Sequence, residues 1–103
     1  MIFAADVFGA EITLFKRPEF AGEQLTLVAA SRDLATHDFR DQASSAIVAS
    51  GRWIACSQPN FSGDCVVLEP GRYDTLDPLV YHRMESIRVA DPEETPAKEA
   101  QKR

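Results

Sequence analysis

Few side chains in this sequence have reactive chemistry, and their spacing matches no catalytic motif. The two histidines, His37 and His82, lie at unrelated positions, and neither neighbours a candidate nucleophile. Cys56 and Cys65 are too far apart for a CxxC redox motif, and no further cysteine or nearby histidine completes a zinc site. A glycine-rich phosphate loop and the GxSxG and HExxH motifs are also missing from the sequence. We therefore expect a protein that is not an enzyme.

Length and charge limit the partners that this chain can have. Its 103 residues, 45% of them hydrophobic, suit one domain with a single core. The net charge of −5 disfavours nucleic acid and anionic membranes as partners, because both attract basic surfaces. The sequence does not identify a partner, and another protein is the one class of partner left open. We expect the folded domain at residues 11–91, between an N-terminal extension at 1–10 and a mobile charged tail at 92–103.

The chain nearly repeats itself after 41 residues. Residues 12–50 align with residues 53–91 without a gap, so that Phe20 falls on Phe61. A fixed period of this length indicates one supersecondary unit used twice, with an apolar face that neither copy can bury alone. We expect two superposable units related by an approximate twofold axis. The pairs expected at matching buried positions are Phe20/Phe61 and Val48/Val89.

Each copy reads as four short strands, with the first unit at about 11–50 and the second at about 52–91. Short β-rich runs are bounded by turn residues, and helical periodicity is weak. The prediction is an all-β sandwich of two Greek keys. Leu34, Ala35 and the stretch Leu76–Val80 could instead form helical turns. The expected strands are Glu11–Lys16, Glu23–Val28, Asp33–Thr36 and Ser45–Ala49, then Arg52–Cys56, Asp64–Glu69, Tyr73–Leu76 and Ser86–Ala90.

Two hairpin motifs give the sequence its resemblance to a known family. Residues 15–22 (FKRPEFAG) place an aromatic, a phenylalanine and a glycine at the spacing found in a βγ-crystallin Greek key. Residues 56–63 (CSQPNFSG) match as well, except that cysteine replaces the leading aromatic. Serine-bearing segments before each last strand add to the likeness. The chain therefore resembles a microbial βγ-crystallin, and the resemblance implies the same two-key sandwich.

The same resemblance implies two calcium sites, each drawing on both keys. The family signature is Asn/Asp, Asn/Asp, two variable residues, Ser/Thr and Ser, which supplies the oxygen ligands that calcium requires. Residues 40–45 (RDQASS) lose one acidic position to arginine, and residues 81–86 (YHRMES) lose both. Arg40 and Arg83 would also repel a dication. We expect calcium binding to be weak or lost, and no other cofactor.

The implied ligands can still be assigned residue by residue. One site would pair Asp41 with Glu85 and the Arg83 carbonyl. The other would pair His82 with Ser44 and the Gln42 carbonyl, and it contains no anion. Alternatively, the serines only organise the turns before the strands, by bonding local backbone groups. The hairpin carbonyls that would complete the two sites are those of Pro18 and Pro59.

The two cysteines lie on opposite arms of the second expected hairpin. In the family, the leading aromatic packs over the hairpin turn and holds it in place. A Cys56–Cys65 disulfide would do the same covalently, and it would favour an exported protein, periplasmic or secreted. Two free thiols in a reducing cytosol are the alternative.

The expected function is that of a stable, non-enzymatic structural or binding module with eroded calcium sites. An exported protease inhibitor of the same fold is the second hypothesis, with Ser57–Asn60 as the only candidate reactive loop. A genuine calcium-binding domain is the third, and it requires both sites to work despite their composition.

Overall fold

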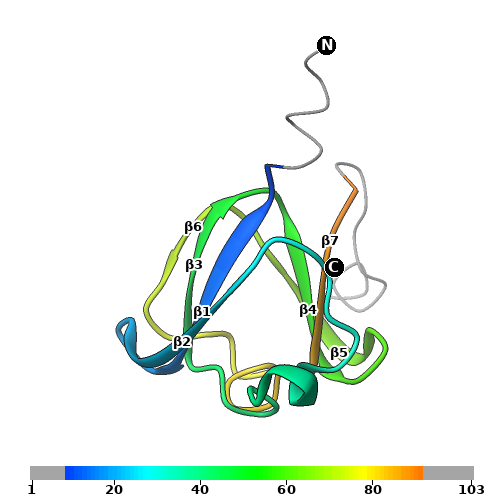
Figure 1. The fold of residues 1–103 in the computed structure, drawn as a ribbon, viewed down its shortest axis with the longest axis horizontal. Helices are drawn as coiled ribbons and strands as arrows, with labels where there is room; N and C mark the ends of the chain where they lie inside the picture. Colours follow the sequence, from blue (N-terminus) through cyan, green and yellow to red (C-terminus); the bar gives the residue numbers. More distant parts are fainter. Residues whose placement is uncertain (1–8, 92–103) are drawn as a thin grey trace.

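A computed structural model describes residues 9–91, which form two antiparallel sheets packed face to face (Figure 1). The first sheet has the strand order β2-β1-β3-β6, and the second has the order β5-β4-β7. The predicted all-β sandwich is confirmed. Among the described residues, no helix is long and apolar enough to cross a membrane. The strands are β1 (Glu11–Arg17), β2 (Ala21–Leu27), β3 (Ser45–Ser50), β4 (Trp53–Gln58), β5 (Ser62–Leu68), β6 (Gly71–Tyr73) and β7 (Ser86–Val89).

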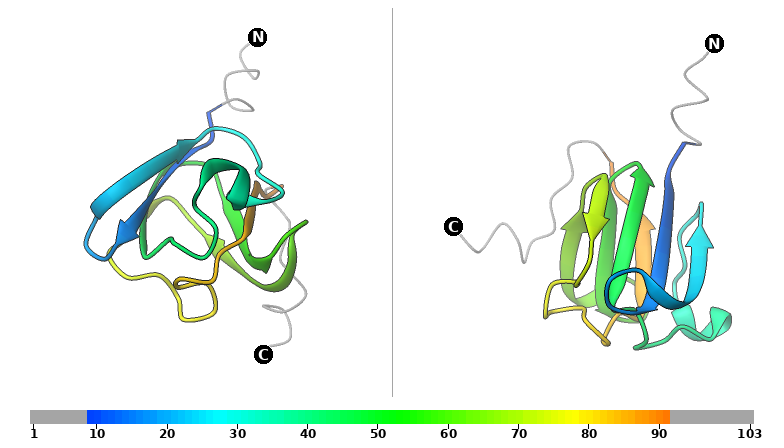
Figure 2. Two further views of the ribbon diagram at one scale, coloured as in Figure 1. Left: turned by 60° about the horizontal axis from the view of Figure 1, so that its bottom comes forward. Right: turned by 90° about the vertical axis from the view of Figure 1, so that its left-hand side faces the viewer.

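Each key contributes backbone from the region after its second strand to the sheet of the other key. The right-hand view of Figure 2 shows β6, from the second key, lying beside β3 of the first. In return, Ser31 of the first key forms an antiparallel bridge with Ile87 of β7, with N···O distances of 2.8 and 3.0 Å. Each sheet therefore contains backbone from both keys, and neither key can complete a sheet alone.

The third strands are where the sequence-based prediction is partly wrong. Instead of a strand at Asp33–Thr36, the chain forms a 3-10 helix, η1 (Leu34–His37), as the helical alternative proposed. The Asp33 carboxylate caps this helix by accepting a hydrogen bond from the Ala35 amide at 3.0 Å, which a continuing strand would not allow. In the second key, β6 ends at Tyr73, and one turn of hydrogen bonds from Val80 and Tyr81 to the Asp77 carbonyl follows it.

The 41-residue repeat is visible in the backbone of the hairpins. Phe20 and Phe61 both adopt left-handed conformations, with φ of 60° and 62°. Gly22 and Gly63 follow with φ of 81° and 83°, a region that side chains rarely tolerate. A Cβ at Gly63 would lie only 2.6 Å from the Ser57 hydroxyl. Both the turn and the close approach of the arms therefore require glycine.

A buried serine at the start of each last strand holds each hairpin turn. Ser45 Oγ donates to the Arg17 carbonyl at 2.7 Å and accepts from the Phe20 amide at 3.0 Å. Ser86 repeats this arrangement, with distances of 2.6 Å to the Gln58 carbonyl and 2.9 Å from the Phe61 amide. Each hydroxyl thus satisfies two backbone groups of a turn that would otherwise lack partners.

The core between the sheets is continuous, and its largest fully buried side chain is Trp53. The indole nitrogen of Trp53 donates to the Ser50 carbonyl at 3.1 Å, so the ring loses no hydrogen bond on burial. Other members come from both keys and both sheets. They include Ile12, Leu14, Leu34, Phe39, Met84 and Ile87.

Two of the expected buried positions differ from the prediction. Val48 is buried, but Val89 is 38% exposed. Val48 pairs with strands on both sides, whereas Val89 pairs only with Trp53 on β4, so it lies at an open edge. Phe20 and Phe61 occupy equivalent places, but both are half-buried on the outer faces of their sheets rather than in the core.

We expect Ser86→Ala to destabilise the domain by about 1–3 kcal/mol, because it leaves the Phe61 amide and the Gln58 carbonyl without their partner. Urea unfolding measures the change. Ser62→Ala is the matched control, since the Ser62 hydroxyl is exposed and bonds only the neighbouring Pro59 carbonyl. Equal, small effects for both variants would contradict the role assigned to Ser86.

Candidate functional site

The two signature segments, 40–45 and 81–86, lie against each other with reciprocal hydrogen bonds. The Asp41 amide donates to the Met84 carbonyl at 3.0 Å, and the His82 amide donates to the Ala43 carbonyl at 2.9 Å. Asp41 and His82 are both left-handed, with φ of 57° and 55°. This arrangement brings the second position of each segment to the fifth position of the other, so two equivalent sites form between the keys.

The first site brings Asp41 together with Glu85, as the predicted ligand pairing requires, and adds Arg40. Arg40 Nε lies 3.5 Å from Glu85 Oε2 and 4.0 Å from Asp41 Oδ2. Burial raises the pKa of Glu85 above its ordinary value of 4.5, and a hydrogen bond and the negative charge of Asp41 raise it further. Arg40 opposes these effects by charge and hydrogen bonding. The site is therefore a pair of carboxylates whose negative charge is partly neutralised by an arginine side chain of the same chain.

The second site brings Ser44 together with His82. The Ser44 hydroxyl donates to the Lys16 carbonyl at 2.7 Å and is also hydrogen-bonded to His82 Nε2. A hydroxyl has only one proton, so Nε2 must donate to Ser44 Oγ. The Tyr81 ring stacks on the imidazole with 4.4 Å between centroids. These contacts occupy the proton and one lone pair of the Ser44 hydroxyl, and they orient the histidine.

The resemblance also implies carbonyl oxygens as calcium ligands, and no contact of the structure places all of them at the two sites. The Pro59 carbonyl already accepts a hydrogen bond from Ser62 Oγ at 2.8 Å, and Pro18 lies in the exposed turn of the first hairpin. Gln42 and Arg83 are exposed next to the two sites. The roles of Pro18, Pro59, Gln42 and Arg83 as carbonyl ligands therefore stay predictions.

The residues present do not fit a calcium ion well at either site. Calcium takes six to eight oxygen ligands, commonly with carboxylates among them. In the first site both carboxylates face a guanidinium, and in the second a histidine stands where an acidic side chain belongs. Within residues 9–91, no group of three or more His, Cys, Asp or Glu side chains could hold a metal ion.

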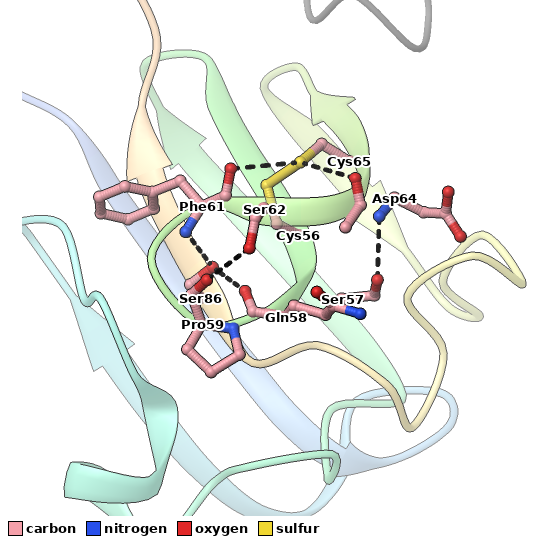
Figure 3. Close-up of a disulfide and its surroundings, with 10 residues drawn as sticks. Cys56, Ser57, Gln58, Pro59, Phe61, Ser62, Asp64, Cys65 and Ser86 are labelled. Carbon is pink, nitrogen blue, oxygen red and sulfur yellow. Dashed lines mark hydrogen bonds between the residues drawn. A yellow bond between two sulfur atoms is a disulfide. The ribbon is translucent and has the colours of Figure 1, made fainter.

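The predicted disulfide is present and joins the arms of the second hairpin (Figure 3). Cys56 on β4 pairs directly with Cys65 on β5, with 4.1 Å between their Cα atoms. In the first hairpin Phe15 is buried against Phe20, with ring centroids 5.8 Å apart. In the second, Phe61 packs with the two cysteines instead. The disulfide therefore lies where the first key has its leading aromatic.

Two cation–π contacts that were not predicted from the sequence join the keys. The Arg72 guanidinium, from the second key, lies 4.6 Å from the Phe20 ring of the first. The Arg32 guanidinium, from the first key, lies 5.6 Å from the Phe61 ring of the second. Both arginines lie near the places where the keys share a sheet. The sequence does show an arginine near the third strand of each copy. Its aromatic partner belongs to the other key, so the contact can be recognised only once the pairing between the keys is known.

The comparisons with known proteins agree with this geometry. The family model described as Beta/Gamma crystallin matches residues 11–90. The chain belongs to this family. A beta/gamma-crystallin from Ciona intestinalis is 43% identical over 63 residues, covering 61% of this chain and 75% of the relative.

Solved structures of the family share the fold. The beta gamma crystallin structure from Ciona intestinalis has a TM-score of 0.74 at 34% identity, covering 78% of this chain and 99% of its own. A βγ-crystallin from an archaeon has a TM-score of 0.73 at 25% identity, covering 79% and 98%. Nearly the whole of each of these two chains therefore aligns with this one.

Reduction of the disulfide should lower the melting temperature by about 10 °C, because a loop this short adds about 2–3 kcal/mol in the chain-entropy model. Scanning calorimetry with and without reductant measures the change, and thiol titration verifies the redox state. The double variant Cys56→Ser/Cys65→Ser is the control, since reductant should no longer affect it. Freely titratable thiols in protein purified without reductant would contradict the bridge.

The raised pKa of Glu85 predicts a pH-dependent effect of Glu85→Gln. Since the fold favours the protonated carboxyl, that contribution to stability is complete below pH 4.5 and is lost as pH rises through the folded-state pKa. We expect the variant to melt at a higher temperature than the parent at pH 7, and this difference should disappear as the pH falls below 4.5. Glu11→Gln, at an exposed strand position, is the control. A lower melting temperature for Glu85→Gln at pH 7 would contradict the assigned direction.

Proposed function

We propose that this domain is a non-enzymatic structural or binding module of a microbial βγ-crystallin type, in which calcium binding is weak or lost. The proposal rests on the side chains that occupy the two sites. Arg40 partly neutralises the Asp41–Glu85 pair, and His82 bonds the Ser44 hydroxyl. Contacts within the chain thus link the keys at the places where the family resemblance implies calcium.

We also propose that the protein is exported and that any partner is another protein. The Cys56–Cys65 disulfide supports export, because such bridges persist in oxidising compartments. The acidic net charge gives no support to nucleic acid or an anionic membrane as the partner.

The protease-inhibitor alternative receives less support from the second hairpin. The candidate loop Ser57–Asn60 is held by the disulfide, which suits a rigid inhibitor loop. However, Ser57 is buried, and the Asn60 amide is bonded to the Arg32 carbonyl at 2.8 Å. Asn60 also has φ of 59°, whereas segments that add to a protein edge as a strand are extended. A panel of protease assays tests this alternative directly.

Calcium titration tests the main proposal. Millimolar calcium should shift the melting temperature of the unmodified protein little, relative to the same protein in EGTA. A ligand at a hundredfold excess over its dissociation constant would stabilise the fold by about 2.7 kcal/mol, which calorimetry would detect easily. Magnesium at the same concentration controls for ionic strength. Saturable binding of two ions at micromolar calcium would overturn the proposal and favour the calcium-binding alternative.

A further inference from the structure

The contacts of Arg40 extend the proposed function, on which the following inference rests. Asp41 belongs to the first key and Glu85 to the second, so the two carboxylates repel each other across the boundary between the keys. Arg40 lies within ion-pair distance of both. Its guanidinium is the only basic group recorded in an ion pair with either carboxylate among the described residues.

We propose that Arg40 is a permanent internal cation, which takes the place of a metal ion at the Asp41–Glu85 site and prevents one from binding there. A guanidinium presents several N–H donors in a fixed plane and stays charged at all ordinary pH values, so it can engage two carboxylates together. Because Arg40 is covalently attached beside the site, its local concentration does not depend on the calcium level. The link between the keys would then be constitutive rather than calcium-dependent.

The second site provides an internal comparison. Tyr81 occupies the position equivalent to Arg40, and it stacks on His82 instead of forming an ion pair. That site pairs a serine with a histidine and has no carboxylate, so no anion requires a cation. A cationic side chain is therefore found at the site with two carboxylates and not at its equivalent without them. This correlation supports charge compensation as the role of Arg40.

The exchange of Arg40 for glutamine tests the proposal. Without the guanidinium, the repulsion between Asp41 and Glu85 is uncompensated, so Arg40→Gln should melt several degrees lower than the parent in EGTA. Calcium should then bind at one site per chain, about tenfold or more tighter than to the parent, and restore the melting temperature. Isothermal titration calorimetry with calcium chloride measures the affinity and the stoichiometry.

Three further variants separate this role from general charge effects. Arg17→Gln removes the same charge from an exposed side chain that is no implied ligand and forms no ion pair with another described residue, so it should gain no calcium binding. Arg40→Lys keeps the positive charge, so its melting temperature should also not respond to calcium. Arg40→Gln/Glu85→Gln should lose the gained binding, because only one carboxylate remains.

Each outcome of the titrations decides between the hypotheses. An Arg40→Gln protein that is unfolded in EGTA but folds in millimolar calcium supports the inference, whereas one that calcium does not rescue contradicts it. A folded Arg40→Gln protein without a calcium response, or an equal gain in Arg17→Gln, also overturns it. Tight binding by the unmodified protein would overturn the proposed function itself.

Discussion

Each half of this domain depends on one buried hydroxyl. Ser45 and Ser86 each bond a carbonyl and an amide of the hairpin turn in their own key. Residues of that turn adopt left-handed backbone conformations, which are strained for side chains other than glycine. The serine hydrogen bonds and the following glycine stabilise this turn. Because the turn folds back over the outer face of the sheet, Phe20 or Phe61 can cover the arms of its hairpin. The disulfide and the aromatic pair reinforce the same geometry in the two keys.

The boundary between the keys is held by contacts that need no ion. Each key contributes backbone to the sheet of the other, and an arginine near each of these pairings lies over the hairpin aromatic of the other key. Arg40 adds a charge contact that spans Asp41 and Glu85. These contacts share one boundary, so their contributions to stability are not expected to be independent. In the proposed function they hold the two halves together in place of calcium.

The sequence predicted the parts of the fold that the repeat encodes. A gapless 41-residue period identified the hairpins and their glycines, because the left-handed backbone at Gly22 and Gly63 leaves few residue choices. It could not predict that each key pairs with the sheet of the other, since that pairing is not local. For the same reason the exposure of Val89 and the partners of Arg32 and Arg72 were missed.

At the site, Asp41 lies beside Glu85 and Ser44 beside His82, which are the residues that the family signature places together. Their roles as calcium ligands stay predictions. The sequence identified Arg40 as a residue that repels calcium. Its position within reach of both carboxylates required the structure, since a side-chain direction cannot be derived from spacing alone. The reciprocal effects of Asp41 and Arg40 on the pKa of Glu85 likewise depend on distances between the keys.

The central claim is that the chain itself fills the place of the ion at the Asp41–Glu85 site. A crystal structure of the unmodified protein grown in millimolar calcium tests it most directly. The account predicts that the Arg40 guanidinium lies between the two carboxylates and that no metal is bound there. A calcium ion coordinated by Asp41 and Glu85, with Arg40 turned away into solvent, would contradict it.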